Sequence, residues 1–260
     1  MFSILRLFMI LATSLQLAAC AAWLPGRSAV TDKEARLNPW ATASDGRRDA
    51  GAWQDFKFPG KQASKFSYVH EDGREAMSAH AQSSASMWRQ VVRVEPAELG
   101  NIRFSWKVPK LIAQADMSTR EMDDSPVRIV LAFDGDRSKF SAKNAMLSEL
   151  ARALTGEEMP YATMMYVWCN ACVRDSVIVN TRTDRIRKLV LESGSGSLNR
   201  WMDYERVIRE DFVKLFGEQP GALISVALMT DTDNTKSVAN AWYGPVNLMP
   251  ALVVKMPHPR

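Results

Sequence analysis

The residues best placed to do chemistry follow an apolar run near the end of the chain. Residues 224–229 are apolar except for Ser225, which is typical of a strand buried on both faces. Directly after it come Asp231, Asp233 and Asn234, whose side-chain oxygens are hard ligands that suit Ca²⁺. The spacing lacks the glycine and the distal glutamate of an EF-hand loop. The stretch therefore predicts either a calcium site or an Asx-turn network in which the same side chains cap backbone amides.

A second group of carboxylates flanks Arg128. Asp123 and Asp124 precede it and Asp134 follows it. Two such carboxylates could act as acid and base in glycoside cleavage if they lie roughly 5 to 9.5 Å apart. The alternative is that Arg128 neutralises them as an ion pair. The G-x-S-x-G turn, the phosphate-binding loop and the dinucleotide fingerprint are all absent from the sequence, so a glycan-active hydrolase or lyase is only an alternative function.

Two cysteines form the motif Cys169-Asn170-Ala171-Cys172. In an oxidising compartment they can form a structural disulfide, and free thiols or redox chemistry are the alternatives. Strand-like residues on both sides differ from the strand-to-helix setting of a thioredoxin-like motif. Zinc would need two more ligands from a chain with three histidines.

The first residues have the pattern of an export signal. Residues 4–17 are largely apolar but too short for a membrane-spanning helix of about 20 residues. The sequence then reads Leu-Ala-Ala-Cys up to Cys20, which resembles the lipobox of bacterial lipoproteins; an ordinary signal peptide cut nearby is the alternative. Ala21 is not the aspartate of an inner-membrane retention signal, which favours an outer-membrane lipoprotein facing the periplasm, held in the membrane by its lipid anchor.

The chain is accordingly divided into residues 1–19 as signal peptide, 20–50 as lipidated tether and 51–260 as a single β-sandwich domain. The 33 basic and 29 acidic residues leave a net charge of +4. So small an excess argues against nucleic acid as a partner.

Strict alternation identifies two strands of the domain. Residues 102–108 and 127–133 each place large apolar side chains on one face. Their other faces carry Arg103, Lys107 and Arg128. If these faces coincide they form a cationic ligand-binding surface; otherwise they are ordinary solvated faces.

Aromatic residues suggest a way to bind sugars. Tyr166 and Trp168, in the strand-like run 163–168, could stack on sugar rings if they face a groove. Trp106 has the alternation of a core residue instead.

Strands predominate in the remainder of the domain. Asp72-Gly73 is the dipeptide of a two-residue type I′ turn and predicts a hairpin that pairs Tyr68 with Met77. Apolar spacing predicts two helices, over residues 143–158 and 199–216.

Several blocks, in this order, resemble a bacterial family of exported domains of unknown function, DUF3047. The blocks are SSAS (83–86), FSWKV (104–108), DDSPVRIVLAFDG (123–135), MMYVW (164–168), WMDYERVIREDFVKLFG (201–217) and SVALMTDTDNTKSVANAWYG (225–244). The resemblance implies a mainly β fold, an antiparallel jelly-roll-like β-sandwich with two inserted helices, similar to carbohydrate-binding modules. The family label implies no activity.

Together these features predict a non-catalytic binding or accessory domain for an envelope glycan or another anionic ligand. A structural component of an envelope assembly, partnered by envelope protein, is a further alternative.

Overall fold

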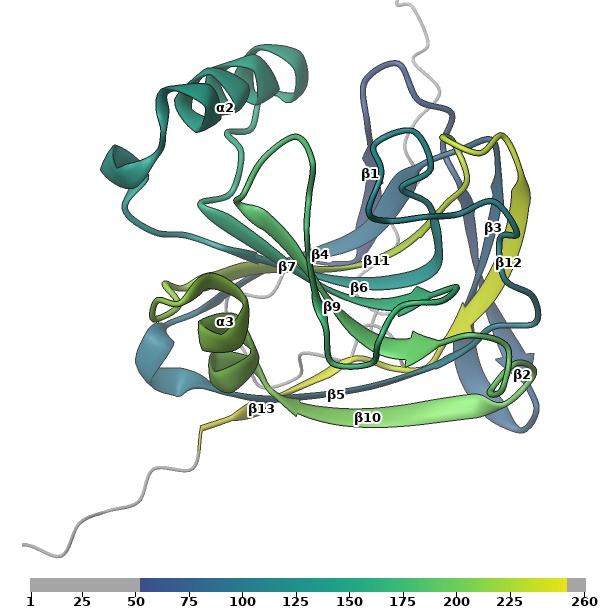
Figure 1. Ribbon diagram of the computed structural model, residues 1–260. Helices are drawn as coiled ribbons and strands as arrows, with labels where there is room; N and C mark the ends of the chain where they lie inside the picture. Colours follow the sequence, from purple (N-terminus) through teal and green to yellow (C-terminus); the bar gives the residue numbers. More distant parts are fainter. Residues whose placement is uncertain (1–51, 252–260) are drawn as a thin grey trace, which may run out of the picture.

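A computed structural model describes residues 52–251, which form two β-sheets packed face to face (Figure 1). The seven-stranded sheet contains, in spatial order, β1 (Gln54–Lys57), β4 (Ser86–Val94), β11 (Leu223–Asp231), β6 (Ser125–Phe133), β7 (Ala162–Cys169), β9 (Ile186–Ser193) and β8 (Val177–Val179). The six-stranded sheet contains β10 (Trp201–Val207), β5 (Leu99–Lys107), β12 (Val238–Tyr243), β3 (Arg74–Gln82) and β2 (Lys65–Glu71), with β13 (Asn247–Pro250) also paired to β5. The predicted mainly β sandwich is confirmed. Within the described part of the chain, the parallel pairing of β7 with β9 is the exception to antiparallel order.

The hairpin β2–β3 forms as the Asp-Gly dipeptide predicts. Asp72 and Gly73 have φ angles of 50° and 77°, the positive values that a type I′ turn requires. Tyr68 pairs with Met77, as expected from a two-residue turn.

The core between the sheets is built from the apolar faces that strand alternation identified. Phe104 and Trp106 of β5 point inward with Ile129 and Leu131 of β6, and all four are buried. The ring of Phe104 stacks 5.3 Å from that of Tyr166, which joins the two sheets. β11 lies between β4 and β6 and is buried on both faces, as its largely apolar run predicted.

The first predicted helix is α2 (Ala142–Thr155), but its apolar stripe is not in the core. Ser141 caps its first turn and Gly156, with φ 78°, ends it. In Figure 1, α2 lies on the side of the seven-stranded sheet that faces away from the six-stranded sheet. Met146, Leu150 and Leu154 are 64%, 52% and 60% exposed, so their periodicity does not report burial here.

The second predicted helix is partly wrong. Residues 201–207 form strand β10, paired with β5, and only Ile208–Phe216 form a helix, α3. Met202 and Tyr204 pack toward the core while Asp203 and Glu205 are exposed, so an alternation of period 2 was hidden within the helical pattern. α3 closes one end of the sandwich, where Phe212 packs on Phe133 with ring centroids 4.7 Å apart.

Among residues 52–251, no helix has both the length and the apolar character needed to cross a membrane. The predicted signal peptide, Cys20 and the tether lie outside the described residues.

Candidate functional site

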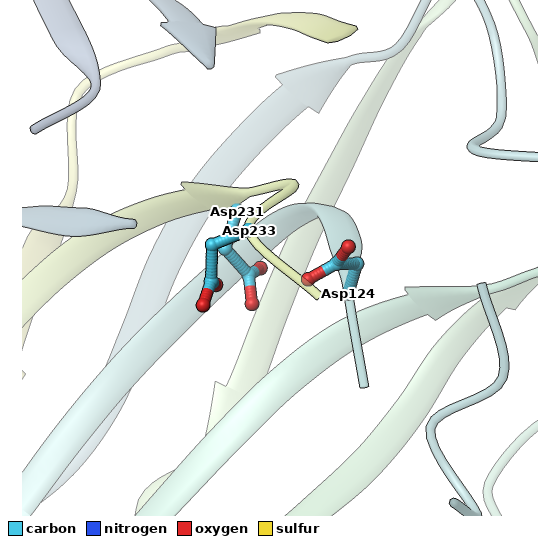
Figure 2. A group of neighbouring side chains, drawn as sticks. All are labelled: Asp124, Asp231 and Asp233. Atoms are coloured by element: carbon cyan, nitrogen blue, oxygen red, sulfur yellow. The ribbon is translucent and has the colours of Figure 1, made fainter. Parts of the chain in front are cut away.

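Four aspartates from two distant parts of the chain meet at one end of the seven-stranded sheet. β6 and β11 are antiparallel neighbours, so the residues before β6 lie beside those that end β11. Asp123 and Asp124 thus meet Asp231 and Asp233. Figure 2 shows the aspartate cluster, which consists of Asp124, Asp231 and Asp233. One carboxylate oxygen from each of the three lies within 4.8 Å of the other two.

Arg128 is the central cation of this end of the sheet. Its side chain is 3% exposed, and Nε and Nη2 donate to the two oxygens of Asp231 at 2.8 and 2.9 Å. Nη2 also donates to a carboxylate oxygen of Asp123 at 3.1 Å. Burial works against the charge of Arg128, but Asp231 and Asp123 outweigh it and raise its pKa. Arg128 is therefore an internal ion-pair partner, and it offers no charge to an external ligand.

Lys188 of β9 is a second buried cation that sequence reasoning missed. Its Nζ donates to both carboxylate oxygens of Asp123 at 2.6 Å, and its side chain is 1% exposed. Burial and the nearby Arg128 lower the pKa of Lys188 to about 8, against the attraction of Asp123. The signal in the sequence was a lysine directly before the apolar residues 189–191 of β9.

Burial also shifts the pKa values of Asp123 and Asp231, the carboxylates that pair with these two cations. Burial alone would raise the pKa of Asp123, but Arg128 and Lys188 lower it overall. For Asp231 burial outweighs the attraction of Arg128 and raises its pKa to about 6.

The turn after β11 is held by Asp124. Its oxygens accept hydrogen bonds from the backbone N–H groups of Asn234 and Thr235, at 3.2 and 2.7 Å, and from the Thr235 hydroxyl at 2.6 Å. The amide of Asn234 donates to the backbone carbonyl of Asp123. The turn is therefore capped at its backbone N–H groups, as in the alternative to a calcium site, but Asp124 caps it in place of the predicted Asp231, Asp233 and Asn234.

The aspartate cluster could still hold a metal ion, with Asp124 in the place predicted for Asn234. Its acceptors are already engaged, because Lys61 pairs with Asp233 and Arg128 with Asp231. Counting Asp123 and Lys188, four carboxylates face three cations. The group is thus nearly neutral without an added cation.

The predicted catalytic carboxylates are not assembled into an open pair. Asp134 follows the far end of β6, where Arg137 donates to it at 2.9 Å. Asp123 and Asp124 lie at the other end, with Asp124 buried and Asp123 held by Arg128 and Lys188. The ion-pair alternative thus holds for Asp123, whereas Asp134 pairs with Arg137 and Asp124 accepts from the turn after β11.

The predicted cationic surface is also not formed. Arg128 belongs to the seven-stranded sheet, whereas Arg103 and Lys107 lie on β5 of the six-stranded sheet. Lys107 is buried, and its Nζ donates to Glu71 and Asp72 at 2.6 Å each. Only Arg103 is exposed, and it pairs with Glu205 at 2.8 Å.

Tyr166 and Trp168 lie in the core, so neither can stack on a sugar. The Tyr166 hydroxyl donates to Asp211 at 2.8 Å, and burial together with Asp211 raises its pKa. The Trp168 indole N–H donates to the Gly194 carbonyl at 3.0 Å. Both face inward from β7, toward the six-stranded sheet.

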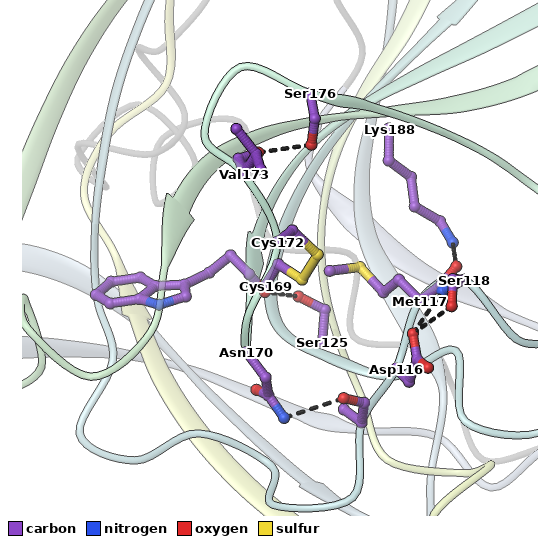
Figure 3. Close-up of a disulfide and its surroundings, with 12 residues drawn as sticks. Asp116, Met117, Ser118, Ser125, Cys169, Asn170, Cys172, Val173, Ser176 and Lys188 are labelled. Atoms are coloured by element: carbon purple, nitrogen blue, oxygen red, sulfur yellow. Dashed lines mark hydrogen bonds between the residues drawn. A yellow bond between two sulfur atoms is a disulfide. The ribbon is translucent and has the colours of Figure 1, made fainter.

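Cys169 and Cys172 are joined by a disulfide at the end of β7 (Figure 3). Asn170, between them, donates to the carbonyls of Ile112 and Ala115 at 2.7 and 3.0 Å, which attaches the turn to the long loop before β6. No helix begins at this motif. The arrangement is that of a structural disulfide.

An open polar groove lies on the outer face of the six-stranded sheet. Its volume is about 420 Å³, and it lies where β10, β5 and the segment leading into β13 meet. The polar side chains that line it are Arg103, Ser105, Asp203, Glu205 and Asn247. Of these, only Arg103 was a predicted site residue.

A row of tryptophans runs beside this groove. Trp201, Lys107 and Trp242 are directly paired across β10, β5 and β12, so they share the outer face, and the spacing of strands places the Cα atoms of the two tryptophans about 10 Å apart. We call these three residues the tryptophan row. The Lys107 ammonium lies 5.1 Å from the Trp242 ring, and the Arg74 guanidinium 5.2 Å from the Trp201 ring. Sequence reasoning missed Trp201, Asp203 and Glu205 because it assigned them to a helix.

The sequence profile of a family described as "Protein of unknown function (DUF3047)" matches residues 51–247. A search of curated proteins found no match. Among solved structures, the fold is similar to the xyloglucanase domain of NopAA, a type three effector from Sinorhizobium fredii, in complex with cellobiose. That pair has a TM-score of 0.41 and 9% identity, covering 78% of this chain and 95% of the other. TmCBM61 in complex with β-1,4-galactotriose gives a TM-score of 0.31 and 12% identity, covering 76% and 88%. Similarity at this level is too low to assign a shared function.

Proposed function

We propose that this chain, which belongs to the DUF3047 family, is a non-catalytic domain that binds a glycan on the outer face of its six-stranded sheet. The polar groove beside the tryptophan row supports this proposal. A sugar presents both an apolar ring face and a rim of hydroxyls. Indole rings can cover the first, and the side chains of the groove can hydrogen-bond the second.

The charges of the groove favour a neutral glycan over a polyanion. Arg103 pairs with Glu205, and Arg74 donates to both oxygens of Asp203 at 2.6 and 3.2 Å. Each exposed arginine is thus matched by a carboxylate. The planar pairs keep acceptor sites free for hydroxyl groups while adding no net charge.

Hydrolysis in this groove is the second candidate, because Asp203 and Glu205 lie two residues apart on one face of β10. A general acid needs a raised pKa. Hydrogen bonds from Asn101 and Arg103 instead lower the pKa of Glu205. We therefore assign binding to the groove, and we expect no release of reducing ends from any glycan that it binds.

The proposed address is the periplasmic face of a bacterial outer membrane. It is supported by the lipobox-like sequence ending in Cys20, by the polar segment 20–50 and by the apolar run 4–17. Lipidation of Cys20 would hold the folded residues, as one domain, within reach of envelope glycans.

Titration calorimetry with neutral glucan and galactan oligosaccharides and with peptidoglycan fragments tests the proposal. We expect saturable binding that Glu205→Gln and Asp203→Asn each weaken about tenfold, because each loses a charged acceptor. The control is Glu149→Gln, on an exposed glutamate of α2 that also pairs with an arginine. The proposal fails if no glycan in the panel binds, or if the groove variants and the control bind alike.

A further inference from the structure

A second groove lies on the opposite side of the molecule, on the outer face of the seven-stranded sheet. Its volume is about 540 Å³, within the range of small-molecule sites. Phe56 and Phe58 form one wall, and Ala151 and Thr155 of α2 lie at the other. It shares no lining residue with the polar groove.

The floor of this apolar groove is a continuous set of cross-strand neighbours. Ala227, Val130 and Met165 are directly paired across β11, β6 and β7, and Met87 pairs with Met229 across β4 and β11. Methionine side chains are flexible and polarisable, and they adapt to an irregular or flexible apolar ligand. The floor is therefore suited to a methylene chain, which has no fixed shape of its own.

The α2 wall is attached mainly by polar contacts. Asn144 donates to Asp184 at 2.7 Å and accepts from Thr183 at 2.8 Å. The apolar side chains Met146, Leu150 and Leu154 of α2 are exposed and do not line the groove.

Arg89 is the only cation among the described residues that line this groove. Its guanidinium lies 4.2 Å from the centre of the Phe56 ring, and it donates to Glu157 through two bonds of 2.6 and 2.8 Å. Its Nε is buried and has no hydrogen-bond partner within the described structure. Glu157 is 52% exposed, so it can turn into water and leave the guanidinium to another carboxylate.

We propose that the apolar groove binds an unbranched aliphatic monocarboxylate, with its methylene chain on the methionine-lined floor and its carboxylate at Arg89. The exchange replaces one carboxylate partner of Arg89 by another, so no charge is left unpaired in the groove. Apolar burial supplies affinity, and Arg89 distinguishes the acid from the corresponding alcohol.

Calorimetric titration of the folded protein with decanoate and with 1-decanol tests this site. We expect one decanoate per chain, bound at least tenfold more tightly than decanol. Glu157→Gln removes the competing carboxylate and should tighten decanoate binding, whereas Arg89→Gln should make the acid and the alcohol bind alike. Absence of saturable decanoate binding, or equal affinity of the wild type for both ligands, would overturn the proposal.

Two exposed valines provide a test variant and a matched control for the position of the decanoate site. Val91 lines the apolar groove and is 43% exposed, while Val238 is on the six-stranded sheet and is 54% exposed. We expect Val91→Glu to weaken decanoate binding at least tenfold and Val238→Glu to leave it unchanged. Equal affinities for the two variants would place decanoate elsewhere. Because the grooves share no residue, Val91→Glu should leave glycan binding intact, so either proposal can fail without the other.

Discussion

Arg128 and Asp231 form a buried ion pair across the neighbouring strands β6 and β11, with Nε–Oδ1 and Nη2–Oδ2 distances of 2.8 and 2.9 Å. Their side chains are 3% and 4% exposed. The pair lies where β11 ends and the turn held by Asp124 begins. It fixes the end of the central strand and the orientation of the following turn.

Removing one partner of this pair should be strongly destabilising. We expect Asp231→Ala to lower the free energy of unfolding by about 3 to 5 kcal/mol, because Arg128 keeps a buried charge with its main partner gone. Urea unfolding followed by circular dichroism measures the change.

The double variant Arg128→Met/Asp231→Leu is the control, since it removes both charges together. We expect it to recover most of the loss. A loss below about 1 kcal/mol in Asp231→Ala would show that water reaches Arg128 and that the pair is not desolvated.

Calcium should add little to the stability of the wild type. Each carboxylate of the aspartate cluster already accepts from Arg128, from Lys61 or from the backbone of the turn. Lys61 is the most exposed of these partners, at 40%. We therefore expect thermal unfolding in calcium and in chelator to coincide for the wild type.

Lys61→Ala would leave Asp233 free to act as a metal ligand. Calcium should then raise the melting temperature by roughly 5 to 11 °C at a concentration 100 times Kd. Adding Asp233→Asn to this variant should abolish the shift. A shift of that size in the wild type would mean that the metal displaces Lys61 and that the cluster is a native calcium site.

Lys188 should make stability depend on pH in the alkaline range. Its pKa is about 8 in the folded protein, against 10.5 as the ordinary value, so the unfolded chain binds more protons between these limits. Stability from this residue therefore rises as pH increases from 8 to 10.5, and it is lost again as pH falls from 10.5 to 8. At about 1.4 kcal/mol per pKa unit the change is roughly 3 kcal/mol.

Lys188→Met removes this titration and leaves the other titrating groups in place. We expect the stability difference between wild type and variant, measured by urea unfolding at several pH values, to change across this window. A difference that stays constant from pH 8 to 10.5 would show that Lys188 titrates normally despite its burial.

Local patterns in the sequence predicted those parts of the fold that depend on neighbouring residues. Asp72-Gly73 set the hairpin register, and alternation placed Phe104 and Trp106 in the core. Pairings between distant segments were out of reach. Asp124 and Thr235 are separated by 111 positions, and only the antiparallel order of β6 and β11 brings them together.

The candidate site was harder to predict than the fold, because it also depends on pairings between distant segments. Arg128 was selected for its charge, but whether its face meets solvent depends on the loop before β6. Met117 of that loop packs on Val167 and Val190 of the sheet, and its carbonyl accepts from Lys188. Trp201 and Glu205 were assigned to a helix because the apolar spacing around them is helical. In the structure, pairing with β5 overrides this pattern over seven residues.

The exposed apolar stripe of α2 should contribute little to stability, although its spacing is that of a buried helix face. Leu150→Glu and Leu154→Lys should each change the free energy of unfolding by no more than about 0.5 kcal/mol, because both side chains are exposed. Phe212→Ala in α3 should cost about 3 to 5 kcal/mol, because that ring is buried against Phe133. Urea unfolding of the three variants compares the helices, and a large loss in either leucine variant would mean that the stripe packs against the body of the protein.

The disulfide should contribute modestly to stability. A loop closed between Cys169 and Cys172 restricts only a short piece of the unfolded chain, which corresponds to about 2 kcal/mol in the chain-entropy account. We expect Cys169→Ala/Cys172→Ala to lose about this amount in urea unfolding. The reduced wild type should match the double variant, and the oxidised wild type should exceed both. If reduction changes nothing, the hydrogen bonds from Asn170 to the carbonyls of Ile112 and Ala115 hold the turn without the covalent link.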